Sequence, residues 1–208
     1  MVENGIQMKL NKINEDINTI EFWDTFYKGC DSNKVWMAVE FDKERCDEII
    51  DCFPKQDGLN VLEIGCGRGH FIRYAKTKFP FKTNYFGVDI SQEAINKCIE
   101  SDKESKYWAS DWINLYGGTH YDIVVCSEVM EHVNNIETLI SNIKAMTNIK
   151  AIFTTPQENQ VDAPSHIWSF KADDIISLFG EWHRTKIWLI KTTNPYKQNY
   201  HFMIEAIK

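Results

Sequence analysis

The sequence lacks an apolar segment that approaches the roughly 20 residues needed to cross a bilayer. Its first residues contain no apolar stretch of the signal-peptide type. None of its six cysteines forms a C-x-x-C pair, and we find no internal repeat or low-complexity tract. These absences argue against a membrane protein, a disulfide scaffold and a repeat array. We expect a cytoplasmic protein with free thiols and no membrane insertion.

Basic residues are also in short supply, because 23 Lys and Arg face 30 Asp and Glu, for a formal net charge of −7. A field of this sign repels phosphate backbones, so nucleic acid is not expected as a partner. With 208 residues, 43% of them hydrophobic, the chain suits one domain that buries a core on both faces of a sheet.

Strand and helix patterns alternate along most of the chain. Residues 1–52 are expected to form a helical cap, with an amphipathic helix at 40–52, and the core is expected at 59–208. Predicted strands cover 59–64, 85–90, 106–109, 121–126, 151–155, 183–191 and 200–207, and predicted helices cover 69–78, 92–101, 133–146 and 172–179. Such alternation is typical of a parallel sheet that has helices on both faces. These sheets bind ligands at the carboxyl ends of their strands.

A glycine-rich turn follows the first core strand in the segment VLEIGCGRG. Gly65, Gly67 and Gly69 allow a tight turn and a close approach of the backbone to a ligand. The dinucleotide fingerprint requires another glycine at the position of His70, which disfavours a nicotinamide oxidoreductase. Glu63 precedes the glycines and suits a cationic amine better than a pyrophosphate.

Carboxylates follow the next two predicted strands. Asp89 ends one strand, beside Ile90, and can accept hydrogen bonds from a ribose diol or act as a helix cap. Asp111 follows the other strand and can accept from an adenine amine, with Trp112 covering the ring. All these positions lie at strand carboxyl ends, where one ligand can contact them together.

The segments VLEIGCGRG, GVD, SDW and DIVVCSEVMEHV, in this order, resemble the class I S-adenosylmethionine-dependent methyltransferases over about residues 59–156. The resemblance implies S-adenosylmethionine as cofactor and an α/β, Rossmann-like, doubly wound seven-stranded sheet with one antiparallel strand near the C-terminus. It places the three glycines around the methionine half of the cofactor, with Glu63 near its amine. It assigns Asp89 to the ribose, Asp111 to the adenine and Ser127 to the vicinity of the sulfonium.

Acidic and imidazole side chains gather after the strand at 121–126. Glu128, Glu131 and His132 share one face if this segment forms a helical turn, and His166 comes from another loop. Two carboxylates and two imidazoles form a candidate divalent-metal site. The Glu-x-x-Glu-His motif resembles the ubiquinone-biosynthesis O-methyltransferases and the small-RNA 2′-O-methyltransferases.

A metal-free site is the alternative for the same residues. His132 then acts as a general base, Glu128 packs by the cofactor, and His166 completes the candidate catalytic set or faces solvent. A purely structural role for these side chains also stays open.

The most favoured activity is methylation of a phenolic or sugar-like hydroxyl on a small molecule. The alternatives are an RNA 2′-O-methyltransferase and a non-catalytic cofactor-binding protein. Aromatic residues at 22–36 and the loop at 157–168 are expected either to form the acceptor pocket or to dock on the core.

Overall fold

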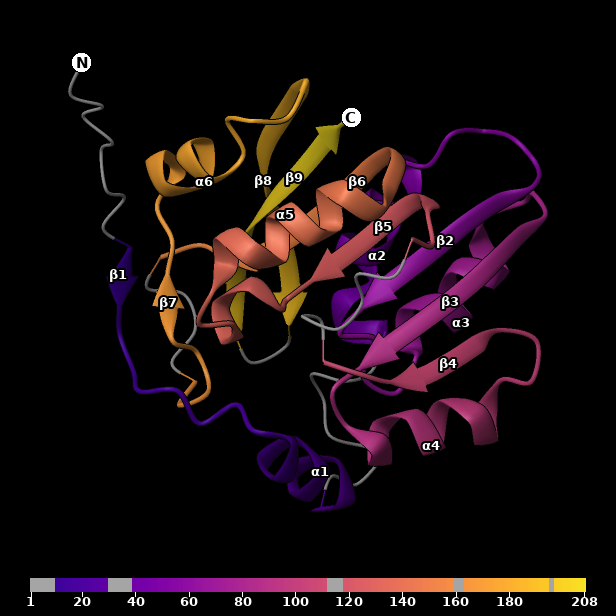
Figure 1. Ribbon diagram of the computed structural model, residues 1–208, viewed down its shortest axis with the longest axis horizontal. Helices are drawn as coiled ribbons and strands as arrows, with labels where there is room; N and C mark the ends of the chain where they lie inside the picture. The colour runs from indigo at the N-terminus through magenta and orange to yellow at the C-terminus, as the bar shows by residue number, and fades with distance from the viewer. Residues whose placement is uncertain (1–9, 30–38, 112–117, 159–162, 195–196) are drawn as a thin grey trace.

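A seven-stranded sheet is the centre of the molecule in the computed structural model, which describes residues 10–29, 39–111, 118–158, 163–194 and 197–208 (Figure 1). Trp112 and part of the predicted 157–168 loop lie outside these residues. The strand order is β4-β3-β2-β5-β6-β9-β8. The strands are β2 (Leu59–Ile64), β3 (Thr83–Asp89), β4 (Lys106–Ala109), β5 (Tyr121–Ser127), β6 (Thr147–Pro156), β8 (Arg184–Asn194) and β9 (Lys197–Ile207).

The strands from β4 to β6 in this order pair in parallel, whereas β9 is antiparallel to both of its neighbours, β6 and β8. The predicted doubly wound sheet with one antiparallel strand near the C-terminus is therefore confirmed. The chain runs from β2 outward to β4 and then returns to β5 on the other side of β2. The carboxyl ends of β2 and β5 therefore flank the point where the strand order reverses, which is where such sheets bind ligands.

Helices cover both faces of the sheet, and α5 lies across the front of it in Figure 1. The helices are α1 (Ile20–Gly29), α2 (Val39–Asp51), α3 (His70–Lys78), α4 (Gln92–Ser101), α5 (Ile136–Met146) and α6 (Ala172–Leu178). One buried core lies under α5 and α6, and the other under α2 and α3. The central strands are apolar on both sides because both faces are covered, as in Val124 and Val125, which are each 0% exposed.

The described N-terminal part contains α1 and α2, but residues 10–19, which were expected to be helical, contain no helix and include a short strand instead. This strand, β1 (Asn11–Lys12), pairs antiparallel with β7 (Trp168–Ser169). Helix α2 packs against β8, and α1 against α4. Two-residue strands carry too little alternation to be recognised in a sequence. The assignment of the chain to one domain stays a prediction.

Two helix starts show how side chains set the element bounds. The Ser91 hydroxyl accepts from the Ala94 amide at 3.2 Å and caps α4, which begins at Gln92 as predicted. The Asn135 side chain accepts from the Thr138 amide at 3.0 Å, so α5 begins at Ile136 and not at Val133 as predicted.

The five described cysteines have free thiols, as expected. No helix among the described residues is both long and apolar enough to cross a membrane.

Neighbouring isoleucines on α6 provide a test of the core under that helix. Ile175 is 0% exposed and Ile176 is 58% exposed. We expect Ile175→Ala to lower the free energy of unfolding by about 2–5 kcal/mol because it leaves a cavity. Ile176→Ala is the matched control and should change it by less than about 0.5 kcal/mol. Urea denaturation monitored by circular dichroism measures both, and equal effects would contradict the placement of α6.

Candidate active site

A cavity of about 750 Å³ lies at the carboxyl ends of β2 and β5. Its volume falls within the range of small-molecule sites. It is lined by the glycine turn, the end of β3, the turn after β5, and residues of α1, α2 and the 163–166 loop. The predicted cofactor residues Glu63, Gly65, Gly67, Asp89, Ile90 and Ser127 all line this cavity.

The glycine turn is held on the end of β3. The amides of Gly65 and Cys66 donate to the Val88 carbonyl at 2.8 and 3.0 Å. Gly65 has φ +70°, and an added Cβ would lie 2.4 Å from a methyl group of Val129. Gly69 has φ +70° and caps α3, where an added Cβ would meet the Cys98 sulfur at 3.1 Å. Gly65 therefore allows close approach within the cavity, whereas Gly69 serves the packing of α3.

Asp89 links β3 to the glycine turn. Its Oδ2 accepts from the Gly67 amide at 2.8 Å, and its Oδ1 accepts from the Ser91 amide at 2.9 Å. The side chain is buried, and burial raises its pKa to about 6 against the opposing effect of these amides. Asp89 is thus ionised near neutral pH and keeps lone pairs for a hydroxyl donor.

Glu63 brings an unpaired carboxyl oxygen to the cavity. It is buried, and its Oε2 has no hydrogen-bond partner among the described residues. Burial raises the pKa of this carboxyl well above its usual value, and the charge of Asp89 contributes. A buried polar atom without a partner costs free energy, which a cationic amine on a ligand would recover. This observation fits the amine of S-adenosylmethionine.

The two residues predicted to contact the adenine, Asp111 and Trp112, are not among the described residues that line the cavity. Ser110 lines the cavity, but its neighbour Asp111 is not among the described lining residues. Trp112 lies outside the described residues. Ser127 lines the cavity and shares a hydrogen bond with the Thr154 hydroxyl at 2.8 Å.

The turn after β5 does not form the expected helical turn. Glu128 has φ +57°, and only Met130–His132 form a short 3₁₀ helix, η3. Because the backbone of Glu128 is left-handed, its side chain does not lie on the same face of the turn as those of Glu131 and His132. Its carboxylate accepts from the Thr154 hydroxyl at 2.9 Å and contacts Arg45 and His201, each at 3.1 Å.

Burial acts to raise the pKa of Glu128, but the Arg45 guanidinium and the His201 ring hold it below its usual value. Arg45, His201 and Thr154 were missed as site residues in the sequence. Arg45 stands on the otherwise apolar face of the predicted helix at 40–52, which is a signal that could have identified it. His201 comes from a distant strand that carries no motif.

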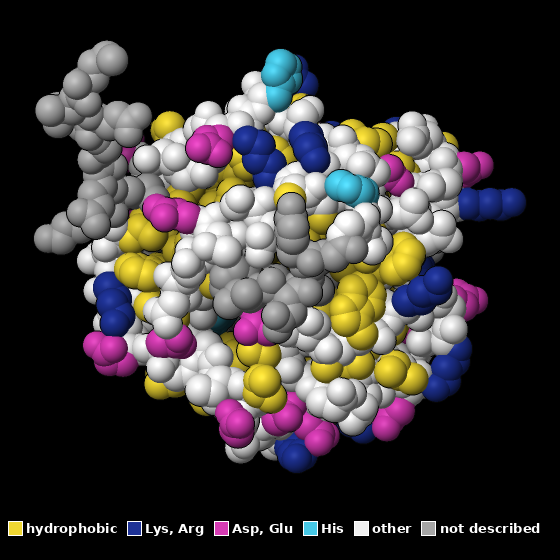
Figure 2. Space-filling model, in the orientation of Figure 1, with side chains coloured by type: hydrophobic (Ala, Val, Ile, Leu, Met, Phe, Trp, Pro, Cys, Tyr) yellow, Lys and Arg dark blue, Asp and Glu magenta, His cyan; other side chains and the backbone are white. Residues whose placement is uncertain are grey.

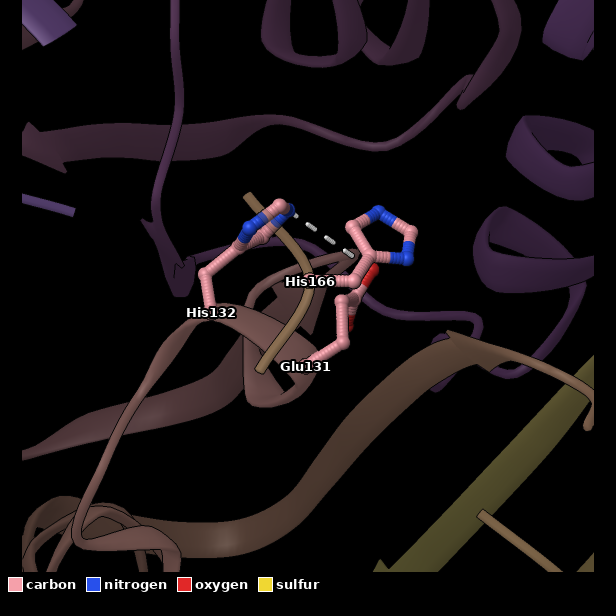
Figure 3. A group of neighbouring side chains, drawn as sticks. All are labelled: Glu131, His132 and His166. Atoms are coloured by element: carbon pink, nitrogen blue, oxygen red, sulfur yellow. Dashed lines mark ion pairs between the residues drawn. The ribbon is translucent and has the colours of Figure 1, made fainter. Parts of the chain in front are cut away.

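Glu131, His132 and His166 converge from two separate segments (Figure 3). One ligand atom from each lies within 4.8 Å of the others. Glu131 Oε2 accepts from the Thr155 hydroxyl at 3.0 Å, while Oε1 has no hydrogen-bond partner among the described residues. Three of the four predicted metal ligands are thus together, and Glu128 is not part of this group.

The hydrogen bonds of His132 determine which ring nitrogen faces Glu131. Its Nδ1 lies 2.9 Å from the Ser165 carbonyl, so Nδ1 carries the proton and donates. Nε2 then has a lone pair and lies 4.0 Å from Glu131 Oε1. A histidine that donates from one nitrogen to a carbonyl is oriented to coordinate a metal with the other.

Burial sets the protonation states of the three residues. Burial and the nearby His166 lower the pKa of His132 to about 4, and burial lowers that of His166. Burial and the charge of Glu128 raise the pKa of Glu131 well above its usual value. Both imidazoles are therefore neutral near pH 7, as metal binding requires.

Aromatic side chains of α1 cover the cavity. The Trp23 ring meets the His132 ring edge-on, with centroids 5.3 Å apart. An added Cβ on Gly67 would lie 2.9 Å from the Tyr27 hydroxyl. The predicted N-terminal aromatics Phe22, Trp23, Phe26 and Tyr27 line the cavity, whereas Trp36 lies outside the described residues.

The model of the family described as a methyltransferase domain matches residues 38–191, well over half of the chain. The chain belongs to this methyltransferase family. The predicted resemblance to class I S-adenosylmethionine-dependent methyltransferases is confirmed at the level of family and fold. The matched residues contain the glycine turn, Asp89 and the Glu131–His132–His166 group.

Curated relatives include a ubiquinone biosynthesis O-methyltransferase from Rickettsia bellii, which is 26% identical over 77% of this chain. A malonyl-[acyl-carrier protein] O-methyltransferase from Pectobacterium atrosepticum is 23% identical over 62% of the chain and 51% of its own length. The chain spans about 60% of the length of the Rickettsia relative.

Solved structures share the fold at low identity. An N-methyltransferase from Bradyrhizobium japonicum in complex with S-adenosylhomocysteine has a TM-score of 0.70 and 16% identity, over 91% of this chain and 98% of its own. A magnesium protoporphyrin IX methyltransferase from Synechocystis, also with bound S-adenosylhomocysteine, has a TM-score of 0.67 and 17% identity, over 90% and 93%.

Gly65→Ala tests the close approach at the glycine turn. We expect it to lower the free energy of unfolding by about 1–3 kcal/mol, because the backbone is left-handed and the new Cβ collides with Val129. Gly118→Ala is the control, since it has φ +78° but open space around the added Cβ. Chemical denaturation of both variants isolates the collision, and equal losses would show that backbone strain alone accounts for the glycine.

Proposed function

We propose that the protein transfers a methyl group from S-adenosylmethionine to a hydroxyl oxygen of a small molecule. When bound, S-adenosylmethionine supplies an electrophilic methyl group on a sulfonium. The observation that carries the proposal is the cavity that joins two sets of residues. Glu63, the glycine turn and Asp89 form one set, and Glu131, His132 and His166 form the other.

The first set suits each part of the cofactor. The unpaired Oε2 of Glu63 accepts from an amine, and Gly65 leaves room for the adjacent chain. Asp89 accepts from the ribose hydroxyls, because a carboxylate has more lone pairs than its two amide donors use. The predicted role of Ser127 near the sulfonium remains part of this proposal, as does that of Asp111 near the adenine.

The second set suits a divalent cation that receives a substrate oxygen. The unpaired Glu131 Oε1, the His132 Nε2 lone pair and the neutral His166 ring offer one carboxylate and two imidazoles. These three residues would hold such a cation, which would lower the pKa of a hydroxyl bound to it. These residues hold the acceptor beside the cofactor and exclude water from it. Without a cation, His132 Nε2 remains as the candidate base.

Oxygen as the accepting atom is supported by the relatives, since those from Rickettsia bellii and Pectobacterium atrosepticum are named O-methyltransferases. An RNA acceptor has less support. Lys and Arg side chains lie scattered among Asp and Glu on the described part of the face in Figure 2, with no continuous basic track there. A cytoplasmic location and a small-molecule acceptor are parts of the same proposal.

Asp89→Asn tests the cofactor assignment. We expect at least about a tenfold loss of S-adenosylmethionine affinity in titration calorimetry, because the amide accepts fewer hydrogen bonds and its nitrogen opposes one of the two backbone donors. For the unmodified protein, affinity should be constant above the Asp89 pKa of about 6 and fall as the pH drops through it. Protonation removes the charge that accepts from the ribose, so the ligand favours the ionised form.

Asp122→Asn is the matched control for this variant. Asp122 also accepts from a backbone amide, that of Asn60 at 2.8 Å, but it lies at the amino end of β5. The Asp122→Asn variant should keep the S-adenosylmethionine affinity of the unmodified protein and the decrease of that affinity at low pH. The Asp89→Asn variant should no longer show this decrease. Unchanged affinity of Asp89→Asn would refute the assignment.

Glu131→Gln tests the metal site. We expect the unmodified protein to bind one Co²⁺ per chain, detected by its visible absorption, and the variant to bind it at least about tenfold more weakly. Glu128→Gln compares the two glutamates of the motif, and should keep the Co²⁺ affinity within a few-fold because Arg45 and His201 already occupy that carboxylate. A comparable loss of Co²⁺ affinity in both variants would instead indicate that Glu128 is also a ligand, as in the predicted set of four. A protein that binds no Co²⁺, or that keeps full activity after chelation, would instead leave His132 as the base.

A further inference from the structure

An N-terminal strap, residues 13–19, runs along the loop that carries His166. The Ile13 amide donates to the Ile167 carbonyl at 2.8 Å. The Asn14 side-chain amide donates to the carbonyls of His166 at 2.9 Å and of Ala163 at 3.3 Å. Figure 1 shows this segment passing between β1 and α1, beside β7. The strap thus holds the backbone on both sides of His166.

Asn18 in the strap shares a hydrogen-bond acceptor with His132. Its Nδ2 donates to the Ser165 carbonyl at 2.9 Å, and the same oxygen accepts from His132 Nδ1 at 2.9 Å. Nδ2 also lies 3.1 Å from Asp16 Oδ1, so both neighbours of this atom are acceptors. The orientation of the Asn18 amide is therefore determined by its partners.

The strap is itself tied to the turn after β5. Asp16 Oδ1 accepts from the Asn18 backbone amide at 2.8 Å, and Asp16 Oδ2 accepts from the Asn134 side chain. Asn134 follows η3, which carries Glu131 and His132. The strap consequently links the two segments that contribute the three candidate ligands.

Stability alone does not account for Asn18. Its Oδ1 is buried and has no hydrogen-bond partner among the described residues, and such an atom costs free energy. The side chain also lines the cavity. Its Nδ2 donates to the Ser165 carbonyl and to Asp16 while Oδ1 stays unpaired, which fits a site in which the position of the Ser165 carbonyl matters.

We propose that Asn18 and Asn14 are positioning residues for the Glu131–His132–His166 group. Asn18 fixes the Ser165 carbonyl, which selects the His132 tautomer with the proton on Nδ1 and leaves Nε2 as the ligand. Asn14 fixes the backbone of His166. Both residues precede the part of the chain that the family model matches, residues 38–191. The functional role of this placement rests on the proposed metal site.

The test uses metal-free protein labelled with ¹⁵N-histidine at about pH 8, where a buried imidazole is neutral. The nitrogen shifts of His132 report which ring nitrogen is protonated. We expect the Nδ1–H form in the unmodified protein and a shift toward Nε2–H in Asn18→Ala. The near-isosteric variant Asn18→Asp should show the same shift toward Nε2–H as Asn18→Ala, because aspartate has the shape of asparagine but no N–H donor. Asn14→Ala should keep the His132 tautomer.

Co²⁺ affinity is the second readout. We expect a loss of about 10–100-fold in Asn18→Ala and Asn14→Ala, as is typical when the residues that orient metal ligands are removed. Glu15→Ala is the control within the strap, because the exposed Glu15 pairs with Lys12 at the surface and should change neither readout. Circular dichroism verifies that each variant is folded.

The outcomes separate this proposal from the metal site. If Asn18→Ala and Asn18→Asp keep the Nδ1–H form, the positioning role of Asn18 is overturned. If the tautomer shifts in these variants while the unmodified protein binds no Co²⁺, the strap orients His132 and the metal site fails. A Glu15→Ala effect equal to that of Asn18→Ala would show that any loosening of the strap suffices, which also contradicts the specific role.

Discussion

The candidate site depends on the burial of ionisable side chains at the carboxyl end of the sheet. Glu63, Asp89, Glu131 and His166 are all buried. Burial disfavours the charged form of each group, so the three carboxyls have raised pKa values and the imidazole a lowered one. Glu63 Oε2 and Glu131 Oε1 have no hydrogen-bond partner among the described residues, so a ligand that supplies these partners should stabilise the fold.

The topology explains why these groups share one cavity. The chain leaves β2, forms β3 and β4, and returns to β5 beside β2. The segments that follow β2 and β5 therefore diverge to opposite sides and leave a crevice between them. Glu63 and Asp89 belong to the first side, and Glu131 belongs to the second. Helix α1 closes the crevice from the N-terminal part, where Trp23 contacts His132 and Tyr27 contacts the glycine turn.

Much of the fold could be predicted from the sequence, because local signals agree with the final packing. The apolar run at 59–64 has the bounds of β2, and α4 has the bounds of the helix predicted at 92–101. The turn after β5 could not be predicted, since a left-handed Glu128 has no signature in residue type. Arg45 and His201 were missed because only tertiary structure brings them to Glu128. The short strands β1 and β7 form a two-stranded sheet with each other, and this pairing exists only in the tertiary structure.

Glu128 and Glu131 show how environment assigns roles to identical residues. They lie three positions apart in the sequence, and both carboxyl groups are removed from water. The pKa of Glu128 is nevertheless lowered, whereas that of Glu131 is raised. Glu128 has an internal cation in Arg45, so it stays ionised and its oxygens are occupied. Glu131 faces neutral histidines and the charge of Glu128, and among the described residues it forms no ion pair with a lysine or an arginine. Two carboxyls whose pKa values are shifted in opposite directions by their surroundings are candidates for different roles. In the proposed function Glu131 is the cation-accepting glutamate of the motif and Glu128 the structural one, a division that the spacing of the residues alone does not reveal.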